Sequence, residues 1–277
     1  MRYSIWRQSR KIENEYLKTL YTLCDMFKKI AQSVGEDQAL YVQRMNQFQS
    51  SYQYEKYIMS AVKRMVTPLA DMNWRTWREA ARKSTQGRFL YSLLTEELEQ
   101  GRKVIIDDQV FENAALIRTL PNDVAQKVVK DIEKEFLKGK RARSIEKIIR
   151  QETDKHSRAS ARLIARTEVS KTQSALTKAR AQALDMQWYV WRTALDGNRV
   201  RPSHRLMEGV LVNWNDPPSP EALAGEKNVG YYHAGNIWNC RCYSDPLLDM
   251  DDVKWPHKVY RNGQIQMMGK REFQQIM

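Results

Sequence analysis

Glycine and proline are distributed very unevenly along this chain of 277 residues. Residues 1–187 contain 2 Pro and 4 Gly, whereas the last 90 residues contain 6 Pro and 7 Gly. Because both residue types interrupt regular structure, the first part can form long helices and the last part is restricted to short strands and turns. The chain is therefore predicted to be α+β: a mainly α-helical N-terminal region with long helices, then a small mixed α/β C-terminal domain with short strands.

Apolar residues in the first part recur at spacings of three and four, which is the pattern of amphipathic helices. The clearest stripe consists of Tyr16, Leu20, Leu23, Phe27, Ile30 and Val34. No heptad pattern persists, so packing within a helical bundle is favoured over a coiled coil. We expect Pro68 to begin a separate helix and Asn122 to cap a later one. Ser144 is expected to cap a short helix that precedes a long basic helix over residues 157–186.

The predicted organisation has three parts. Residues 1–140 form a helical arm or bundle. Residues 141–250 form a domain that contains the basic helix and a small β-rich module over residues 187–250. Five of the eight tryptophans lie after residue 187 and supply the bulky material that a small β-rich core needs. Residues 251–277 form a tail of mixed charge, and we expect the chain from Asp249 onward to be extended.

Three short strands are predicted in the β-rich module, over residues 188–195, 210–212 and 241–248. A strong turn signal, Asp196-Gly197, closes the first strand. Residues 215–236 are too rich in Pro, Gly and Asn for regular structure, so they are expected to form a long loop.

Positive charge is concentrated in one stretch. The chain carries a formal charge of +13, and residues 138–180 contain 13 Lys or Arg against 4 Asp or Glu. Cations one helical turn apart share a helix face, and such a row can contact DNA phosphates without reading bases. The row, called the basic row below, consists of Lys155, Arg158, Arg162 and Arg166. The alternative is a solvated face or a protein interface, with arginines paired to Glu152, Asp154 or Glu168; Leu163 and Ile164 are expected to form the packing face.

Two cysteines form a C-x-C motif, Cys240 and Cys242. In an extended segment, residues two apart point to the same side, so both thiols can reach one metal ion. His204 and His233 would complete a tetrahedral structural zinc site. The alternative is that the thiols are simply buried and that His204 is hydrogen-bonded to an acid.

A second polar cluster follows the first predicted strand and consists of Asp196, Arg199, Arg201 and His204. A metal-dependent nuclease would use His204 as general base and Asp196 as metal ligand. One carboxylate and one histidine make a poor two-metal site, however. A charge network in which Asp196 and the arginines fix the turn is the favoured interpretation.

Composition also limits the compartment. Three cysteines, two of them in one C-x-C, cannot form a disulfide framework and fit a reducing cytosol. No window approaches about 18 consecutive apolar residues, and no apolar segment follows the basic N-terminus. We therefore expect synthesis in a cytoplasm, with no membrane span and no secretory signal.

Several motifs occur in an order that resembles one family. The run A-R-L-I-A-R-T-E over residues 161–168 is similar to a helix of the phage head-morphogenesis family, the Mu F-like minor head proteins. The closing N-C-R-C over residues 239–242, preceded by Gly235, is similar to the end of the family's pattern. Further family-motif residues lie between the start of this helix motif and Gly235. The set consists of Arg166, Thr167, Glu168, Trp191, Asp196, Arg199, Arg201, His204 and Gly209. The resemblance covers about residues 140–248 and makes residues 141–250 a head-morphogenesis domain.

The resemblance implies a structural protein of a tailed phage or prophage virion rather than an enzyme. It implies association with the portal protein, or with the major capsid or scaffold protein, in the head interior or at the portal vertex. A role in head assembly, and in packaging or ejection of double-stranded DNA through non-specific contacts, follows from the same resemblance. Such a protein would be made in the cytoplasm of a bacterial host.

Overall fold

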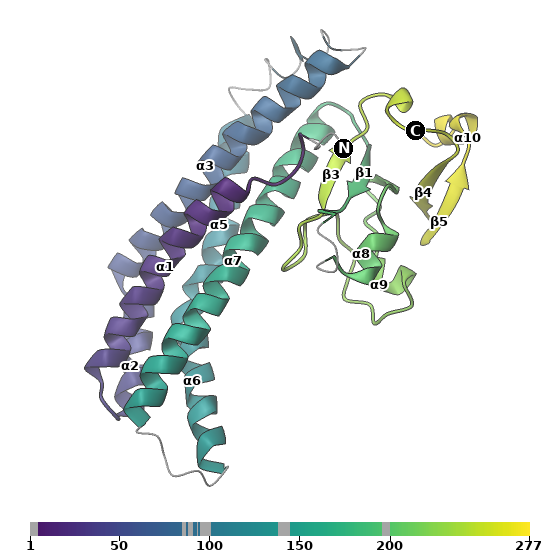
Figure 1. The fold of residues 1–277 in the computed structure, drawn as a ribbon. Helices are drawn as coiled ribbons and strands as arrows, with labels where there is room; N and C mark the ends of the chain where they lie inside the picture. The colour runs from purple at the N-terminus through teal and green to yellow at the C-terminus, as the bar shows by residue number, and fades with distance from the viewer. Residues whose placement is uncertain are drawn as a thin grey trace. The chain divides into compact units, whose positions relative to one another are not determined.

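A computed structural model describes residues 5–84, 87, 91–92, 94, 101–137, 145–195 and 200–277. As predicted, a mostly helical N-terminal region with long helices precedes a small five-stranded mixed sheet (Figure 1). The chain divides into two compact units. The helical unit comprises residues 10–67 and 107–165, and the sheet unit comprises residues 1–9, 68–106 and 166–277. The division of the chain into residues 1–140, 141–250 and 251–277 stays a prediction.

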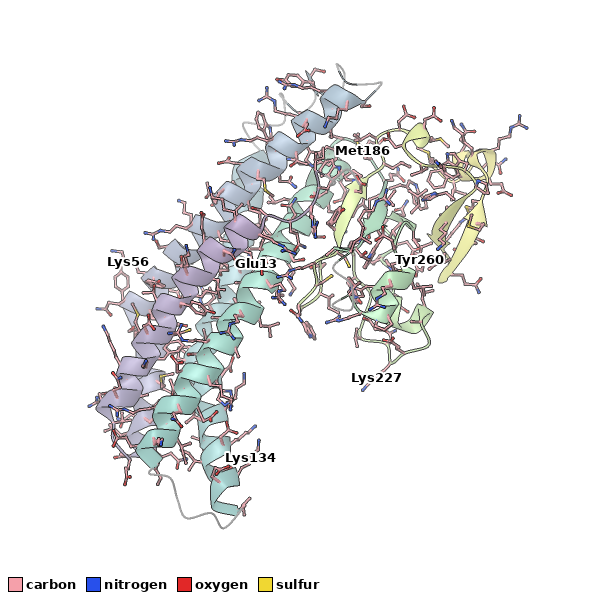
Figure 2. All side chains as sticks on the ribbon, in the orientation of Figure 1. Glu13, Lys56, Lys134, Met186, Lys227 and Tyr260 are labelled. Carbon is pink, nitrogen blue, oxygen red and sulfur yellow. The ribbon has the colours of Figure 1, made fainter. Side chains whose placement is uncertain are left out.

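The helical unit is built from amphipathic helices. Its helices are α1 (Arg10–Ser33), α2 (Gln38–Gln49), α6 (Leu120–Leu137) and parts of α3 (Tyr52–Lys83), α5 (Gly101–Arg118) and α7 (Ile145–Ala183). The predicted stripe of α1 is buried through Leu20, Leu23 and Phe27. Helix α2 packs against α1 and α6. Exposed Lys56 and Lys134 point away from the helices that carry them (Figure 2).

Three predicted helix boundaries are wrong. Pro68 lies inside α3, not at the start of a helix, and its ring is on the exposed side while Leu69 next to it is buried. Helix α6 begins at Leu120, so Asn122 lies in its first turn and does not cap it. The basic helix begins at Ile145 and continues unbroken to Ala183, because no Gly or Pro interrupts that stretch.

The sheet has the strand order β3-β1-β2-β4-β5. Strands β2 and β4 pair in parallel, and the other neighbours pair antiparallel. The five strands are β1 (Trp188–Arg192), β2 (Leu211–Asn213), β3 (Tyr243–Pro246), β4 (His257–Arg261) and β5 (Gln264–Met268). The first three confirm the predicted strands: β1 and β3 are shorter than predicted, and β2 is shifted by one residue.

Strand β1 is buried on both faces. Tyr189 and Trp191 belong to one apolar cluster, whereas Trp188 and Val190 belong to another. This alternation places successive side chains on opposite sides of the sheet, as strand geometry requires.

The expectation of an extended tail is wrong. Strands β4 and β5 form a hairpin, and Asn262 and Gly263 between them have φ values of 51° and 77°. These angles are those of a two-residue hairpin turn of the Asn-Gly kind. Helix α10 (Lys270–Gln274) follows, and its buried Phe273 packs edge-on against Trp188 at 4.9 Å between ring centroids.

Two short helices connect the strands of the sheet unit. Helix α8 (Pro202–Leu206) follows β1, and α9 (Pro220–Leu223) lies within the segment predicted as an irregular loop. The two helices contact each other. No helix of the described segments combines the length and apolar character needed to cross a membrane.

Candidate metal centre

Three of the four predicted zinc ligands lie together in the sheet unit. Nδ1 of His204 is 3.4 Å from Sγ of Cys242 and 3.6 Å from Sγ of Cys240. All three side chains are buried, and their ligand atoms lie within 4.8 Å of one another. An imidazole nitrogen and two thiols at this spacing could hold a metal ion, and this donor set is one that zinc prefers.

Helix α7 holds the loop that carries the cysteines. The N–H of Asn239 donates to Oγ1 of Thr167 at 3.0 Å, and Nη1 of Arg166 donates to Oδ1 of Asn239 at 2.6 Å. Asn239 itself has φ 60°, a left-handed conformation that asparagine tolerates better than most residues. The family-motif residues Arg166 and Thr167 therefore fix the backbone just before Cys240.

A close approach of backbone to α7 explains Gly235. Oγ of Ser170 on α7 donates to the carbonyl of Gly235 at 2.8 Å. Gly235 has φ +84°, and a Cβ there would lie 2.9 Å from the carbonyl oxygen of Cys242. Any larger residue would therefore push the cysteine loop away from the helix.

The other ring nitrogen of His204 is held by a buried relay. Nε2 lies 3.0 Å from the hydroxyl of Tyr232, which in turn donates to both carboxylate oxygens of Glu221 on α9, at 2.7 and 2.6 Å. Burial, followed by the neighbouring Glu221, raises the pKa of Tyr232, so this hydroxyl stays protonated. Such an outer partner fixes the tautomer of a metal-binding histidine and directs its free nitrogen to the metal.

The pKa values of the two cysteine thiols are shifted in opposite directions. The hydrogen bond with Cys242, followed by the effect of His204, holds the pKa of Cys240 well below its usual range, although burial opposes this. The same contact with Cys240, with burial, raises the pKa of Cys242. Metal binding would require both as thiolates, so it would release the remaining proton.

The fourth predicted ligand, His233, lies elsewhere. Its Nδ1 is 3.2 Å from the hydroxyl of Tyr189, and its Nε2 is 3.4 Å from Nζ of Lys178. Burial, with the charge of Lys178, lowers the pKa of His233 to about 4. His233 therefore belongs to the core beside Trp214 and does not complete the group around His204.

Other motif residues support the core around the group. The ring of Trp191 packs edge-on against His204 at 5.8 Å. Gly209, at φ +76°, donates its N–H to the carbonyl of Trp191 at 2.9 Å. Glu168 is buried. Asp196 and Arg199, in contrast, lie outside the described residues.

The nuclease interpretation gains no support from His204. Both of its ring nitrogens have protein partners, one the sulfurs and the other Tyr232, whereas a general base needs a nitrogen within reach of the proton that it removes. Its proposed metal-binding partner, Asp196, lies outside the described residues.

A cavity of about 290 Å³ adjoins the group. Its lining includes the three candidate ligands and three arginines, Arg166, Arg201 and Arg241. Nη2 of Arg201 donates to the carbonyl of Trp238 at 2.9 Å. The candidate metal ligands and the three arginines therefore line the same pocket.

The basic row of α7 is partly engaged within the protein. Nζ of Lys155 lies 2.6 Å from Glu152. Arg158 lies 2.9 Å from Asp154 and 3.0 Å from Asp25. These contacts agree with the alternative interpretation of the basic row, in which its cations pair with neighbouring acids.

The remaining two members of the row each contact an uncharged side chain. Nε of exposed Arg162 donates to the hydroxyl of Tyr21 at 2.9 Å, and Arg166 contacts Asn239. The expected packing face is also wrong at Leu163, which is exposed, because small Ala161 and Ala165 are the buried residues of this stretch.

Glu221, Tyr232 and Arg241 were not predicted as site residues. Glu221 looks like an ordinary acid at a helix start, and Tyr232 lies in a segment that resembles a variable loop. Of these three residues, only Arg241 has a local sequence feature that could have marked it as a site residue, namely its position between the two cysteines. The relay forms because α9 and the segment that carries Tyr232 lie next to α8 in the folded chain. The spacing of residues in the sequence does not predict this proximity.

Comparisons with known proteins point to one family. Residues 126–244 match the family model described as "Phage Mu protein F like protein". A protein of Haemophilus influenzae, described only as uncharacterized, is 29% identical over 140 residues, which cover 50% of this chain and 29% of that relative. The chain thus spans less than a third of this relative's length. No solved structure matches. The matched segment holds the motif helix, the histidine and both cysteines, and over this segment the chain is similar to the phage Mu F-like family.

Proposed function

We propose that this chain is a structural minor head protein of a tailed phage or prophage that acts in head assembly. The observation that carries the proposal is the family match over residues 126–244, since similarity to this family implies a phage head morphogenesis protein. The geometry supports a structural task for the motif. Arg166 and Thr167 use their polar groups to fix the cysteine loop.

The proposed location is the head interior or the portal vertex, in contact with the portal protein or with the major capsid or scaffold protein. Purified particles test it by quantitative mass spectrometry and cross-linking. We expect the chain in DNA-filled heads at a defined copy number, cross-linked to one of these partners. Absence from particles in which the portal is detected would refute the proposal.

We further propose that His204, Cys240 and Cys242 hold a structural zinc ion. Protein purified without chelator should contain about one equivalent, and Cys240→Ser should lose it and destabilise the sheet unit, because a structural site contributes folding free energy. Cys24→Ser is the matched control, since Cys24 is buried in the helical unit and should leave zinc content unchanged. Less than about half an equivalent in the unmodified protein would contradict the site.

We propose no catalytic activity for the chain. The family is generally structural, and the contacts of His204 suit a metal ligand better than a general base. Incubation with plasmid DNA and Mg²⁺, Mn²⁺ or Zn²⁺ is therefore expected to leave the plasmid intact. Cleavage that is abolished by His204→Ala would establish the nuclease instead.

Packaged DNA is the remaining proposed partner, contacted without sequence preference through the basic row. Arg162 supports this proposal best, because it is exposed and its partner, Tyr21, is uncharged. Lys155 and Arg158 contribute less, since each already faces a carboxylate.

A further inference from the structure

A group of two carboxylates and one imidazole in the helical unit has no role in the functions proposed above. It consists of Asp131 on α6 and of Glu152 and His156 on α7, and one ligand atom from each lies within 4.8 Å of the others. We propose that this group, called the α6–α7 cluster below, binds a divalent transition-metal ion, of which zinc fits best. Such a site is independent of the zinc site proposed for the sheet unit, because the two share no residue.

Helix geometry brings two of the three side chains together. Glu152 and His156 are four residues apart on α7, so they project from one face of the helix on successive turns. Zinc-binding helices place two ligands at this spacing, because both can then reach one ion. The third side chain, Asp131, belongs to α6. Since two helices supply the donors, a bound ion would connect α6 to α7.

The distances within the α6–α7 cluster are close to those of a coordination sphere. Nε2 of His156 lies 2.6 Å from Oδ2 of Asp131 and 3.6 Å from Oε2 of Glu152. Bonds of about 2.0–2.2 Å to a tetrahedral zinc ion would place neighbouring ligand atoms about 3.3–3.6 Å apart. The imidazole and Glu152 already have this separation, and Asp131 needs to withdraw only slightly. Small rotations of the side chains would therefore direct all three donors at one ion.

The types of donor atom select the class of ion. Magnesium and calcium prefer sites built from oxygen atoms, whereas an imidazole nitrogen favours zinc and neighbouring transition metals. Zinc accepts both histidine nitrogen and carboxylate oxygen, and a site with three protein ligands leaves a position for water. Two ionised carboxylates balance the charge of a divalent ion, and a neutral imidazole adds none. The donor set and its charge therefore favour zinc over magnesium or calcium.

Two lysines pair with the carboxylates, so a metal ion has to displace them. Nζ of Lys155 lies 2.6 Å from Oε2 of Glu152, and Nζ of Lys134 lies 3.6 Å from Oδ1 of Asp131. Both lysine side chains are 67% exposed, whereas those of the cluster are between 22% and 25% exposed. Exposed ion pairs contribute little to stability because solvent screens them. Their loss would therefore oppose metal binding only weakly, and both ammonium groups can turn into solvent.

Equilibrium dialysis of the full chain against Zn²⁺, followed by metal analysis, tests the proposal. We expect the unmodified protein to hold about one equivalent more than His156→Gln, which keeps a polar side chain but lacks the imidazole. Zinc bound elsewhere in the chain is present in both proteins and cancels in the difference. Two equivalents against one would support both zinc sites, and one against none would support the α6–α7 cluster while refuting the cysteine site.

Variants of the carboxylates test the other two ligands. Asp131→Asn and Glu152→Gln should each weaken the binding of this equivalent about tenfold or more, since each removes a charged ligand. Glu146→Gln is the matched control. Glu146 lies on α7 and pairs with Arg150, outside the cluster, so the affinity should stay within about twofold.

Thermal unfolding gives a second readout. An ion that binds only the folded protein stabilises it, so zinc should raise the unfolding midpoint of the unmodified protein more than that of His156→Gln. Midpoints measured without zinc show whether each variant is folded before its affinity is compared. If His156→Gln lowers the midpoint strongly, Asp131→Asn takes its place in the dialysis.

Three outcomes would overturn the proposal. Equal zinc content of the unmodified protein and folded His156→Gln would mean that the group is an ion-pair network only. Equal weakening by Glu146→Gln would mean that zinc responds to the general charge of α7. Displacement of this zinc by Mg²⁺ in about hundredfold excess would mean that the imidazole is not a ligand, because magnesium requires oxygen donors.

Discussion

His204 has one ring nitrogen directed at two sulfur atoms and the other at Tyr232. The relay ends at Glu221, a carboxylate that is 5% exposed. A buried carboxylate is costly unless donors satisfy it, so Tyr232 stabilises the acid and orients the histidine at the same time. The three candidate ligands could be predicted from residue type and spacing. The relay could not, because its members lie on segments that share no local pattern.

Removal of one hydroxyl tests the relay. Tyr232→Phe keeps the ring and leaves Glu221 without its shortest hydrogen bonds. We expect the free energy of unfolding to fall by about 1–3 kcal/mol in urea titrations, the cost of an unsatisfied buried polar group. Tyr231→Phe is the control, because Tyr231 is 68% exposed and should change stability by less than about 0.5 kcal/mol. Equal stability of both variants would mean that the relay contributes nothing.

His233 predicts a dependence of stability on pH. Its pKa is about 4 in the folded protein against 6.5 ordinarily, so the unfolded chain binds the extra proton between these values. Stability from this group is complete above about pH 6.5 and falls as pH drops towards about 4. The groups facing the ring are Lys178, Tyr189 and Trp214.

The measurement compares unmodified protein with His233→Gln. Between about pH 7 and about pH 5, the unmodified protein should lose about 2 kcal/mol more unfolding free energy than the variant. The difference between the two removes the contribution of every other titrating group that they share. Parallel pH profiles would show that the ring is not held neutral by burial.

At the scale of elements, the periodicity of apolar residues predicted which helices and strands exist better than it predicted where they begin and end. The stripe of α1 and the first three strands follow from spacing, but α7 is continuous where a break before Ser157 was expected. The expected cap of the short helix, Ser144, lies outside the described residues. Strands β4 and β5 were missed although Asn262-Gly263 is a strong hairpin signal. The mixed charge of this segment concealed its alternation, because the hairpin buries few of its side chains.

Pro68 provides a test of how α3 tolerates an interior proline. Pro68→Ala restores a backbone N–H and removes the ring from the helix, so the free energy of unfolding should rise by about 1–2 kcal/mol. The gain is below the full propensity difference, since proline also restricts the unfolded chain. Lys63→Ala, at an exposed position of the same helix, should change stability by less than about 0.5 kcal/mol. Destabilisation by Pro68→Ala would show that packing requires the local geometry of proline.

For the whole molecule, the uneven distribution of glycine and proline was enough to predict the fold class. It could not reveal which segments form each compact unit, because α3 and α7 each contribute residues to both. Membership in a unit depends on side-chain packing between segments that are distant in sequence. The formal charge of +13, in contrast, is a property of the whole chain that sequence gives directly, and it leads to a prediction about DNA.

Affinity for double-stranded DNA should fall steeply with salt, because each phosphate contact releases condensed counterions. If Arg162 contacts a phosphate, Arg162→Gln should reduce the slope of log affinity against log salt by about 0.9, measured by fluorescence anisotropy with a short duplex. Arg64→Gln removes the same charge from an exposed position on α3 and should leave the slope unchanged. Arg158→Gln should have a smaller effect than Arg162→Gln, since Asp154 and Asp25 already neutralise that guanidinium. Equal slopes for Arg162→Gln and Arg64→Gln would show that DNA responds to the net charge of the molecule and not to the basic row.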